Sequence, residues 1–151
     1  MAKKKPAKKE APEFVLDCSL TMAWYFKDEA HAYAKAVRKA LTRASAVVPA
    51  LWRLEVANIL VLGERRKRST EAEASKWLRL MQMLPIRVDD ETTVRAWSDI
   101  LHVARAHDLS AYDAAYLELA ERLGVPLASL DDKLKAAAVS AGVAQFTPTS
   151  S

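Results

Sequence analysis

The chain has 151 residues and 51% hydrophobic content, which fits one compact domain and excludes a disordered or fibrous protein. Its formal net charge is +4 and its only cysteine is Cys18, so an internal disulfide and a cysteine-based zinc site are excluded. No apolar run approaches the roughly 20 residues that span a bilayer, and the amino terminus lacks the apolar segment of a signal peptide, so we expect a cytoplasmic protein without a membrane span.

The positive charge lies at the amino terminus. The stretch MAKKKPAKKE holds five lysines and one glutamate, so the rest of the chain has 18 basic and 18 acidic residues. Its lysines and prolines, without apolar periodicity, predict a disordered basic arm over residues 1–12, followed by one domain over 13–148 and a tail over 149–151. The arm fits either a solubilising or cloning-derived extension or a loose attraction to nucleic-acid phosphates.

Short apolar runs alternate with longer amphipathic stretches along the domain. We expect strands at EFVLDC, SAVVP, PIRV and VPLASL, and VAQFTP is a candidate fifth strand at an edge. The expected helices cover SLTMAWYFKD, capped by Ser19, then EAHAYAKAVRKALTRA, residues 51–67, STEAEASKWLRLMQM, residues 91–107, residues 110–123, and DDKLKAAAVSA. This alternation predicts a parallel sheet covered by helices on both faces. With three glycines and no glycine-rich phosphate loop, nucleotide-binding folds are disfavoured.

Glu55 is the acid in the apolar run LWRLEVANIL. A charge on the buried face of a helix is costly unless a proton, a partner or a cation compensates it. The neighbouring cation, Arg53, points to another side of the helix. Most helical neighbours of Glu55 are apolar: Leu51, Trp52, Asn58, Ile59 and Leu62. The sequence therefore predicts that a group from elsewhere in the fold compensates Glu55.

Three further acids are expected at the same edge of the sheet as Glu55. Asp17 and Asp131 follow strands, and Asp113 lies in the first turn of its helix. Each has a simpler interpretation, because the first two could cap helices and Asp113 completes a capping box with Ser110. Together, however, four carboxylates at the carboxyl edge of a parallel sheet would repel one another unless a cation intervened. Oxygen ligands with few histidines favour Mg²⁺ or Mn²⁺ over zinc.

Four segments, in their order and spacing, resemble the PIN-domain ribonucleases, particularly the toxin subunits of VapBC-type toxin-antitoxin pairs. They are VLDCS, LWRLEVANIL, LSAYDAAYLELAERLGVPL and ASLDDKL, and the resemblance runs from about residue 13 to residue 146. It implies a three-layer α/β/α sandwich with a central, mostly parallel sheet of four to five strands, which cuts RNA with Mg²⁺ or, in its place, Mn²⁺. By position, the resemblance assigns catalysis and metal binding to Asp17, Glu55, Asp113 and Asp131, and a supporting role to Ser19 and Ser129.

The same resemblance implies two protein partners. The helices around residues 51–83 would form an apolar groove for an antitoxin segment, and the chain would form a homodimer. Two features depart from the usual family pattern, namely the lysine arm and the bulky cluster Trp24-Tyr25-Phe26. The basic run ERRKRS, residues 64–69, ends roughly 20 Å along its helix from Glu55. It fits a solvated helix end, or a contact with distal RNA or an acidic partner.

Two other enzyme or signalling classes fit the sequence less well than the nuclease. DCSLT also resembles the Asp-x-Asp-x-Thr box of haloacid-dehalogenase-like phosphotransferases, but Ser19 replaces the second Asp and removes the general acid. A receiver-like phosphoacceptor module requires an acidic pair next to the end of the first strand and a lysine at a late strand, and this sequence lacks both. A catalytically inactive PIN-like module that binds RNA or protein stays open as the alternative. The four acids favour catalysis over that alternative, because a lost activity leaves no reason to keep buried charge.

Overall fold

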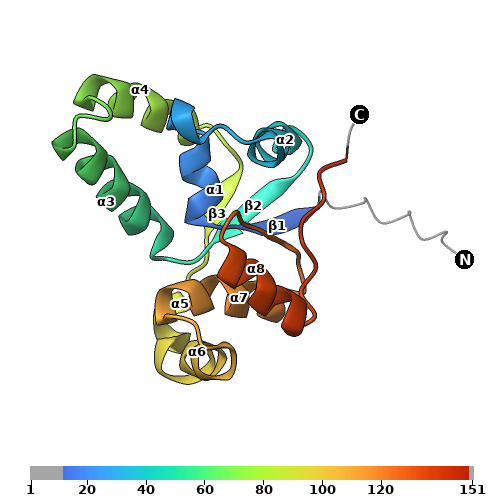
Figure 1. The fold of residues 1–151 in the computed structure, drawn as a ribbon. Helices are drawn as coiled ribbons and strands as arrows, with labels where there is room; N and C mark the ends of the chain where they lie inside the picture. Colours follow the sequence, from blue (N-terminus) through green and yellow to red (C-terminus); the bar gives the residue numbers. More distant parts are fainter. Residues whose placement is uncertain (1–11, 150–151) are drawn as a thin grey trace, which may run out of the picture.

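The computed structural model of the chain describes residues 12–149. Four strands form an all-parallel sheet in the order β3-β2-β1-β4, with helices on both of its faces (Figure 1). The strands are β1 (Glu13–Leu16), β2 (Ser45–Val48), β3 (Ile86–Val88) and β4 (Leu127–Ala128). The predicted α/β/α sandwich with a parallel sheet is confirmed. The predicted basic arm lies outside the described residues except for Pro12.

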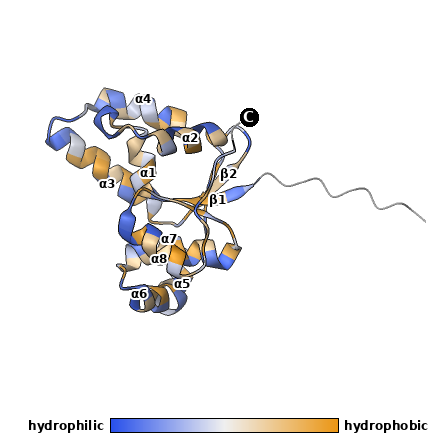
Figure 2. Cartoon of the chain, turned by 45° about the vertical axis from the view of Figure 1, so that its right-hand side comes forward, coloured by the Kyte–Doolittle hydropathy of each residue, from blue (hydrophilic) through white to orange (hydrophobic). Residues whose placement is uncertain are grey.

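The helices divide between the two faces of the sheet. Figures 1 and 2 place α1 and α2 on one side of the strands and α7 and α8 on the other. The helices are α1 (Cys18–Ala23), α2 (Ala32–Ala40), α3 (Trp52–Arg65), α4 (Glu71–Met81), α5 (Thr92–Arg95), α6 (Leu101–His107), α7 (Ala111–Leu123) and α8 (Asp132–Ser140), with a 3₁₀ turn η1 (Lys27–Glu29) and a π-helical turn η2 (Ala96–Ile100). Within the described part of the chain, no helix is both long and apolar enough to cross a bilayer.

The core lies where β1 and β2 meet the central helix α7. Three of the four residues in each of these strands are buried, as expected for parallel strands covered on both faces. Every residue of α7 from Ala114 to Ala120 is also buried. This burial fixes α7 against the sheet and therefore fixes the position of its first turn.

Side-chain caps mark the starts of several helices. Thr70, Ser110 and Asp131 each accept a hydrogen bond from the backbone N–H three residues further on, at the starts of α4, α7 and α8. The predicted cap of α1 is wrong. That helix begins at Cys18 with Asp17 in the cap position, and the hydroxyl of Ser19 donates to the Asp17 carboxylate instead of accepting from a backbone N–H of the first turn.

The candidate fifth strand is reduced to a single bridge between Leu127 and Gln145. Side-chain contacts, rather than a long ladder of backbone hydrogen bonds, hold this segment in place. The ring of Phe146 stacks on Phe14 with 4.0 Å between ring centroids, and the hydroxyl of Tyr33 donates to the Phe146 carbonyl at 2.6 Å. The segment is therefore tied to β1 by aromatic stacking and to α2 by a hydrogen bond.

The predicted helix over residues 91–107 is interrupted. A π-helical turn, η2, separates α5 from α6, and such turns add a residue to the helical repeat. Trp97 in η2 is 93% exposed and Val94, one turn earlier, is 81% exposed. These two side chains form an apolar patch on the surface of the molecule.

One cation of the basic run belongs to the fold. The guanidinium of Arg68 lies 3.9 Å from the ring centroid of Phe26 and forms ion pairs with Asp28 at 3.1 Å and Glu29 at 3.2 Å. It thereby connects the turn after α3 to η1. Figure 2 shows that this turn is strongly hydrophilic.

Candidate active site

The four predicted acids gather at the carboxyl edge of the sheet. Asp17 directly follows β1, and Glu55 and Asp113 lie in the first turns of α3 and α7. Asp131 follows β4 and stands at the start of α8. Their charges act on one another, because each of the first three has its pKa raised partly by at least one of the other acids.

Asp17 lies deepest, with 5% of its surface exposed. Its Oδ2 accepts hydrogen bonds from the hydroxyl of Ser19 at 2.6 Å and from the hydroxyl of Ser129 at 2.7 Å. Each serine oxygen in turn accepts from a backbone N–H of the loop after β4, at Leu130 for Ser19 and at Asp131 for Ser129. The two predicted supporting hydroxyls therefore fix the orientation of Asp17 and tie it to the loop that carries Asp131.

The electrostatics of Asp17 disfavour its charge. Burial raises the pKa of Asp17, and the hydrogen bonds from Ser19 and Ser129 offset part of that rise. The charges of Asp113 and Asp131 raise the pKa further. Because no ion pair joins Asp17 to a cation within residues 12–149, a bound cation would stabilise its ionised form.

Glu55 is half-buried, so the sequence-based expectation of a buried charge holds in part. Its Oε1 accepts a hydrogen bond from the hydroxyl of Tyr116 at 2.5 Å. Burial raises the pKa of Glu55, the bond from Tyr116 lowers it, and the charges of Asp17 and Asp113 raise it again. The side chain that hydrogen-bonds to Glu55 is thus a neutral phenol rather than a basic group.

A second contact fixes the start of α3 beside Asp17. The indole N–H of Trp52 donates to the hydroxyl of Thr21 at 3.0 Å, and that hydroxyl donates to the backbone carbonyl of Asp17 at 3.2 Å. Thr21 is fully buried and Trp52 is 8% exposed. Since Glu55 lies less than one turn after Trp52, this chain of contacts fixes the position from which the Glu55 side chain projects.

Asp113 and Asp131 combine local and shared roles. Burial raises the pKa of Asp113, and the charge of Asp131 raises it further, whereas Lys133 and Ser110 lower it. The backbone N–H of Asp113 donates to the Ser110 hydroxyl at 3.1 Å. Asp131 caps α8, because its Oδ1 accepts from the Leu134 N–H at 2.8 Å. Capping and membership of the acid group are therefore compatible.

The composition of the site fits a divalent cation. All four side chains offer hard oxygen donors, and among residues 12–149 none of them forms an ion pair with Lys or Arg. Three mutually close acids, within 4.8 Å of one another, occur in the described residues only at Asp89, Asp90 and Glu91. The predicted acids are more widely spaced than that group. This spacing suits an ion held partly through water, as Mg²⁺ commonly is.

Two acids of the trio of Asp89, Asp90 and Glu91 already have cationic partners. Arg122 donates to both carboxylate oxygens of Asp89, at 2.8 and 3.2 Å, and Glu91 pairs with Arg122 at 3.3 Å and with Arg95 at 3.1 Å. Burial alone would raise the pKa of Asp89, but the hydrogen bonds and charge of Arg122, with help from Thr92, lower it below its usual value. We therefore assign this trio to the fold rather than to a metal.

Sequence reasoning missed two partners of buried acids, namely Tyr116, which contacts Glu55, and Arg122, which contacts Asp89. A signal for Tyr116 exists, because it lies three residues after Asp113 and so shares one face of α7 with it. The spacing of Glu118 and Arg122, four residues apart, likewise predicts a helical ion pair, which the structure contains at 2.9 Å. The pairing of Arg122 with Asp89, far away in the chain, has no comparable signal.

Known proteins share this architecture. The family model described as PIN domain matches residues 14–140. The solved structure of PAE2754 from Pyrobaculum aerophilum is similar, with 26% sequence identity, a TM-score of 0.63, and coverage of 84% of this chain and 85% of that one. FitAcB from Neisseria gonorrhoeae shares the fold, with 20% identity, a TM-score of 0.57, and coverage of 89% and 97%. No curated protein sequence matches the chain.

Proposed function

Because this chain belongs to the PIN domain family, we propose that it is a metal-dependent endoribonuclease that hydrolyses RNA phosphodiester bonds. The observation that carries the proposal is the set of four carboxylates at one sheet edge, held by hydroxyls and by a backbone N–H, without a paired cation in the described residues. Such an arrangement is costly for the fold by itself and is stabilised by an external cation.

The side chains divide the work. Asp17, Glu55, Asp113 and Asp131 would hold one or two Mg²⁺ or Mn²⁺ ions. The ion supplies electrophilic activation of the scissile phosphate and lowers the pKa of a water nucleophile. Ser19 and Ser129 keep Asp17 in a single orientation. No basic side chain is needed to remove a proton from water in this scheme.

The direct test is cleavage of RNA by the purified chain and by an Asp113→Asn variant. We expect the wild type to cut with Mg²⁺ or Mn²⁺ and to stop when EDTA is added. The variant should lose at least about 100-fold in rate, which corresponds to about 2.7 kcal/mol in the barrier, because one acid that holds the ion is gone. Asp90→Asn is the matched control and should keep its activity. Cleavage in EDTA, or by Asp113→Asn, would contradict the proposal, and RNA binding without cleavage would support the inactive module.

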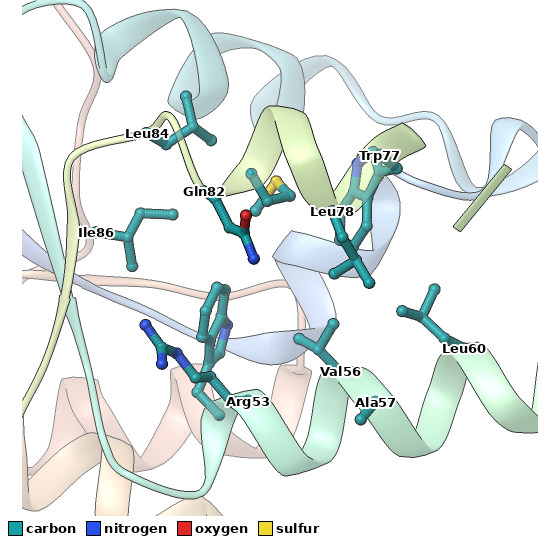
Figure 3. A pocket seen from close by; sticks show the side chains of 11 residues that line it. Arg53, Val56, Ala57, Leu60, Trp77, Leu78, Gln82, Leu84 and Ile86 are labelled. Carbon is teal, nitrogen blue, oxygen red and sulfur yellow. The ribbon is translucent and has the colours of Figure 1, made fainter. Parts of the chain in front are cut away.

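We further propose that the nuclease is the toxin of a toxin-antitoxin pair. A groove of about 320 Å³ lies between α3 and α4, and its walls are largely apolar (Figure 3). Val56, Leu60, Leu78 and Met81 line it, and Arg53 and Gln82 provide polar groups. A groove of this kind suits the apolar face of a helical antitoxin segment. Co-expression with the product of a small neighbouring reading frame should give a stable complex, and Ala57→Glu should prevent it.

We also propose a homodimer in solution. The exposed patch of Val94 and Trp97 supports it, because a tryptophan that is 93% exposed is unusual for a surface without a partner. Sedimentation velocity at micromolar concentration should report a dimer for the wild type. Trp97→Glu should shift the protein to a monomer, and a monomeric wild type would remove the proposal.

A further inference from the structure

Tyr116 is a fully buried residue whose hydroxyl needs a partner. Its exposed fraction is 0%, and a buried hydroxyl without a hydrogen bond is costly. Among the described residues, its hydroxyl hydrogen-bonds to Oε1 of Glu55, at 2.5 Å. A phenylalanine would fill the same space without carrying a buried hydroxyl. Packing alone therefore does not explain why this position holds tyrosine.

The contact joins the two helices that carry central acids of the site. Tyr116 lies on α7, three residues after Asp113, while Glu55 lies on α3. Glu55 has a long, flexible side chain, and within residues 12–149 its carboxylate forms no ion pair. The hydrogen bond from Tyr116 therefore restricts the rotation of the Glu55 carboxylate relative to α7.

Glu55 and Asp17 are held in the same manner. Ser19 and Ser129 both donate to Oδ2 of Asp17, and Tyr116 donates to Oε1 of Glu55. In both carboxylates the hydroxyl donors occupy one oxygen and leave the other without a side-chain donor among the described residues. A carboxylate held in this way has one oxygen available for a cation, and its orientation is fixed in advance.

From this geometry we propose that Tyr116 is a positioning residue of the site, whose hydroxyl fixes the Glu55 carboxylate so that its second oxygen binds the divalent cation. The inference rests on the proposed function and adds a residue to it. Hydrogen-bond partners of metal ligands typically change metal affinity by about 10- to 100-fold when they are removed. Tyr116 acts only through Glu55 and does not touch the substrate.

The test compares two tyrosine variants that each lose one strong hydrogen bond. Tyr116→Phe removes the bond to Glu55, and Tyr33→Phe removes the bond to the Phe146 carbonyl, away from the acids. Mn²⁺ affinity is measured by titration calorimetry, and kcat and KM are measured on an RNA oligonucleotide. We expect Tyr116→Phe to bind Mn²⁺ about 10- to 100-fold more weakly, with lower kcat at limiting metal and an unchanged KM for RNA. Tyr33→Phe should keep the wild-type Mn²⁺ affinity.

A double-mutant cycle separates positioning from a general loss of stability. In a Glu55→Gln background, adding Tyr116→Phe should produce no further loss of Mn²⁺ affinity, because the carboxylate that Tyr116 positions is already gone. An equal loss in both backgrounds would overturn the inference, as would wild-type Mn²⁺ affinity in Tyr116→Phe. If the wild type neither binds Mn²⁺ nor cleaves RNA, the proposed function fails, and this inference fails with it. The two failures are therefore distinguishable.

Discussion

Asp17 and Asp89 occupy equivalent places in the fold but have different partners. Each is the residue directly after a parallel strand, Asp17 after β1 and Asp89 after β3, and each is 5% exposed. Hydroxyls of two serines hold Asp17, and its pKa is raised. The guanidinium of Arg122 holds Asp89, and its pKa is lowered.

The difference shows that the partner of a buried acid, rather than its depth, indicates its role. Arg122 neutralises Asp89 and joins the end of β3 to α7, so the charge is compensated within the fold. Asp17 has hydroxyl partners that orient its carboxylate without neutralising it. The fold thus neutralises the charge of Asp89, whereas the carboxylate of Asp17 has no cationic partner among the described residues. The predictions below test this division.

The largest effect is expected where the compensating cation is removed. Arg122→Met takes the guanidinium from Asp89 and Glu118, which are 5% and 4% exposed. It leaves Asp89 without an ion pair among the described residues and Glu118 with only Arg95, at 3.9 Å. Loss of one partner of a buried pair costs about 3–5 kcal/mol. We expect a drop of about 3 kcal/mol or more in the free energy of unfolding, measured by urea denaturation with the metal removed.

Arg87→Met is the matched control for that variant. Arg87 also forms a two-point ion pair, with Glu13 at 2.8 and 2.9 Å, but its side chain is 53% exposed. Exposed pairs contribute no more than about 1 kcal/mol. Equal losses in the two variants would show that Arg122 is no more than a surface contact.

The next effect concerns the response to metal. Mn²⁺ should raise the free energy of unfolding of the wild type by about 2.7 kcal/mol at a concentration 100 times its Kd, because only the folded state binds it. At the same Mn²⁺ concentration Glu55→Gln should lose most of that rise, because three of the four acids remain, and Glu91→Gln should keep it. Thermal melts with Mn²⁺ and with EDTA measure this difference. The reverse pattern would move the metal to the trio of Asp89, Asp90 and Glu91.

The sequence predicts the acid group well because local rules determine it. An acid after a strand, or in the first turn of the next helix, lies at the carboxyl edge of a parallel sheet whatever the details of packing. Asp17 and Asp113 are placed correctly on that basis, and the cap at Asp131 follows from its position before α8. The four parallel strands follow from their short apolar runs in the same way.

Contacts between distant segments are beyond such rules. Nothing local connects Tyr116 with Glu55, 61 residues away, or Arg122 with Asp89, 33 residues away. The sequence predicts Ser19 as a helix cap, because hydroxyl residues commonly begin helices, but its hydroxyl donates to the Asp17 carboxylate. The π-helical turn before α6, which packs against α7, likewise has no local signal in the sequence.

A smaller effect is expected in the pH dependence of stability without metal. The raised pKa of Asp17 means that the folded state keeps its proton longer than the unfolded state, so stability should fall as pH rises from the ordinary value of 3.8 through the raised pKa. The lowered pKa of Asp89 gives the opposite sign, with stability present above 3.8 and lost as pH falls through the lowered pKa.

Two isosteric variants separate these contributions. Asp17→Asn should remove part of the fall above the ordinary pKa, and Asp89→Asn should remove part of the fall below it. Each slope is limited to about 1.36 kcal/mol per pH unit for one proton. Urea unfolding in EDTA across this pH range measures both slopes. If both variants changed the same side of the profile, the contrast between the two acids would be wrong.

The smallest effect concerns Asp131, which caps a helix and also belongs to the group of four acids. Its Oδ1 caps α8 through the Leu134 N–H, while its charge raises the pKa of Asp17 and Asp113. Asparagine caps as well as aspartate but carries no charge, whereas alanine removes both functions, and loss of a cap costs about 1 kcal/mol. In EDTA, Asp131→Asn should therefore be at least as stable as the wild type, and Asp131→Ala about 1 kcal/mol less stable than Asp131→Asn, by urea unfolding. If Asp131→Asn were clearly less stable than the wild type without metal, the negative charge would be favourable in the apo fold, and the repulsion among these acids would not be the reason that the site needs a cation.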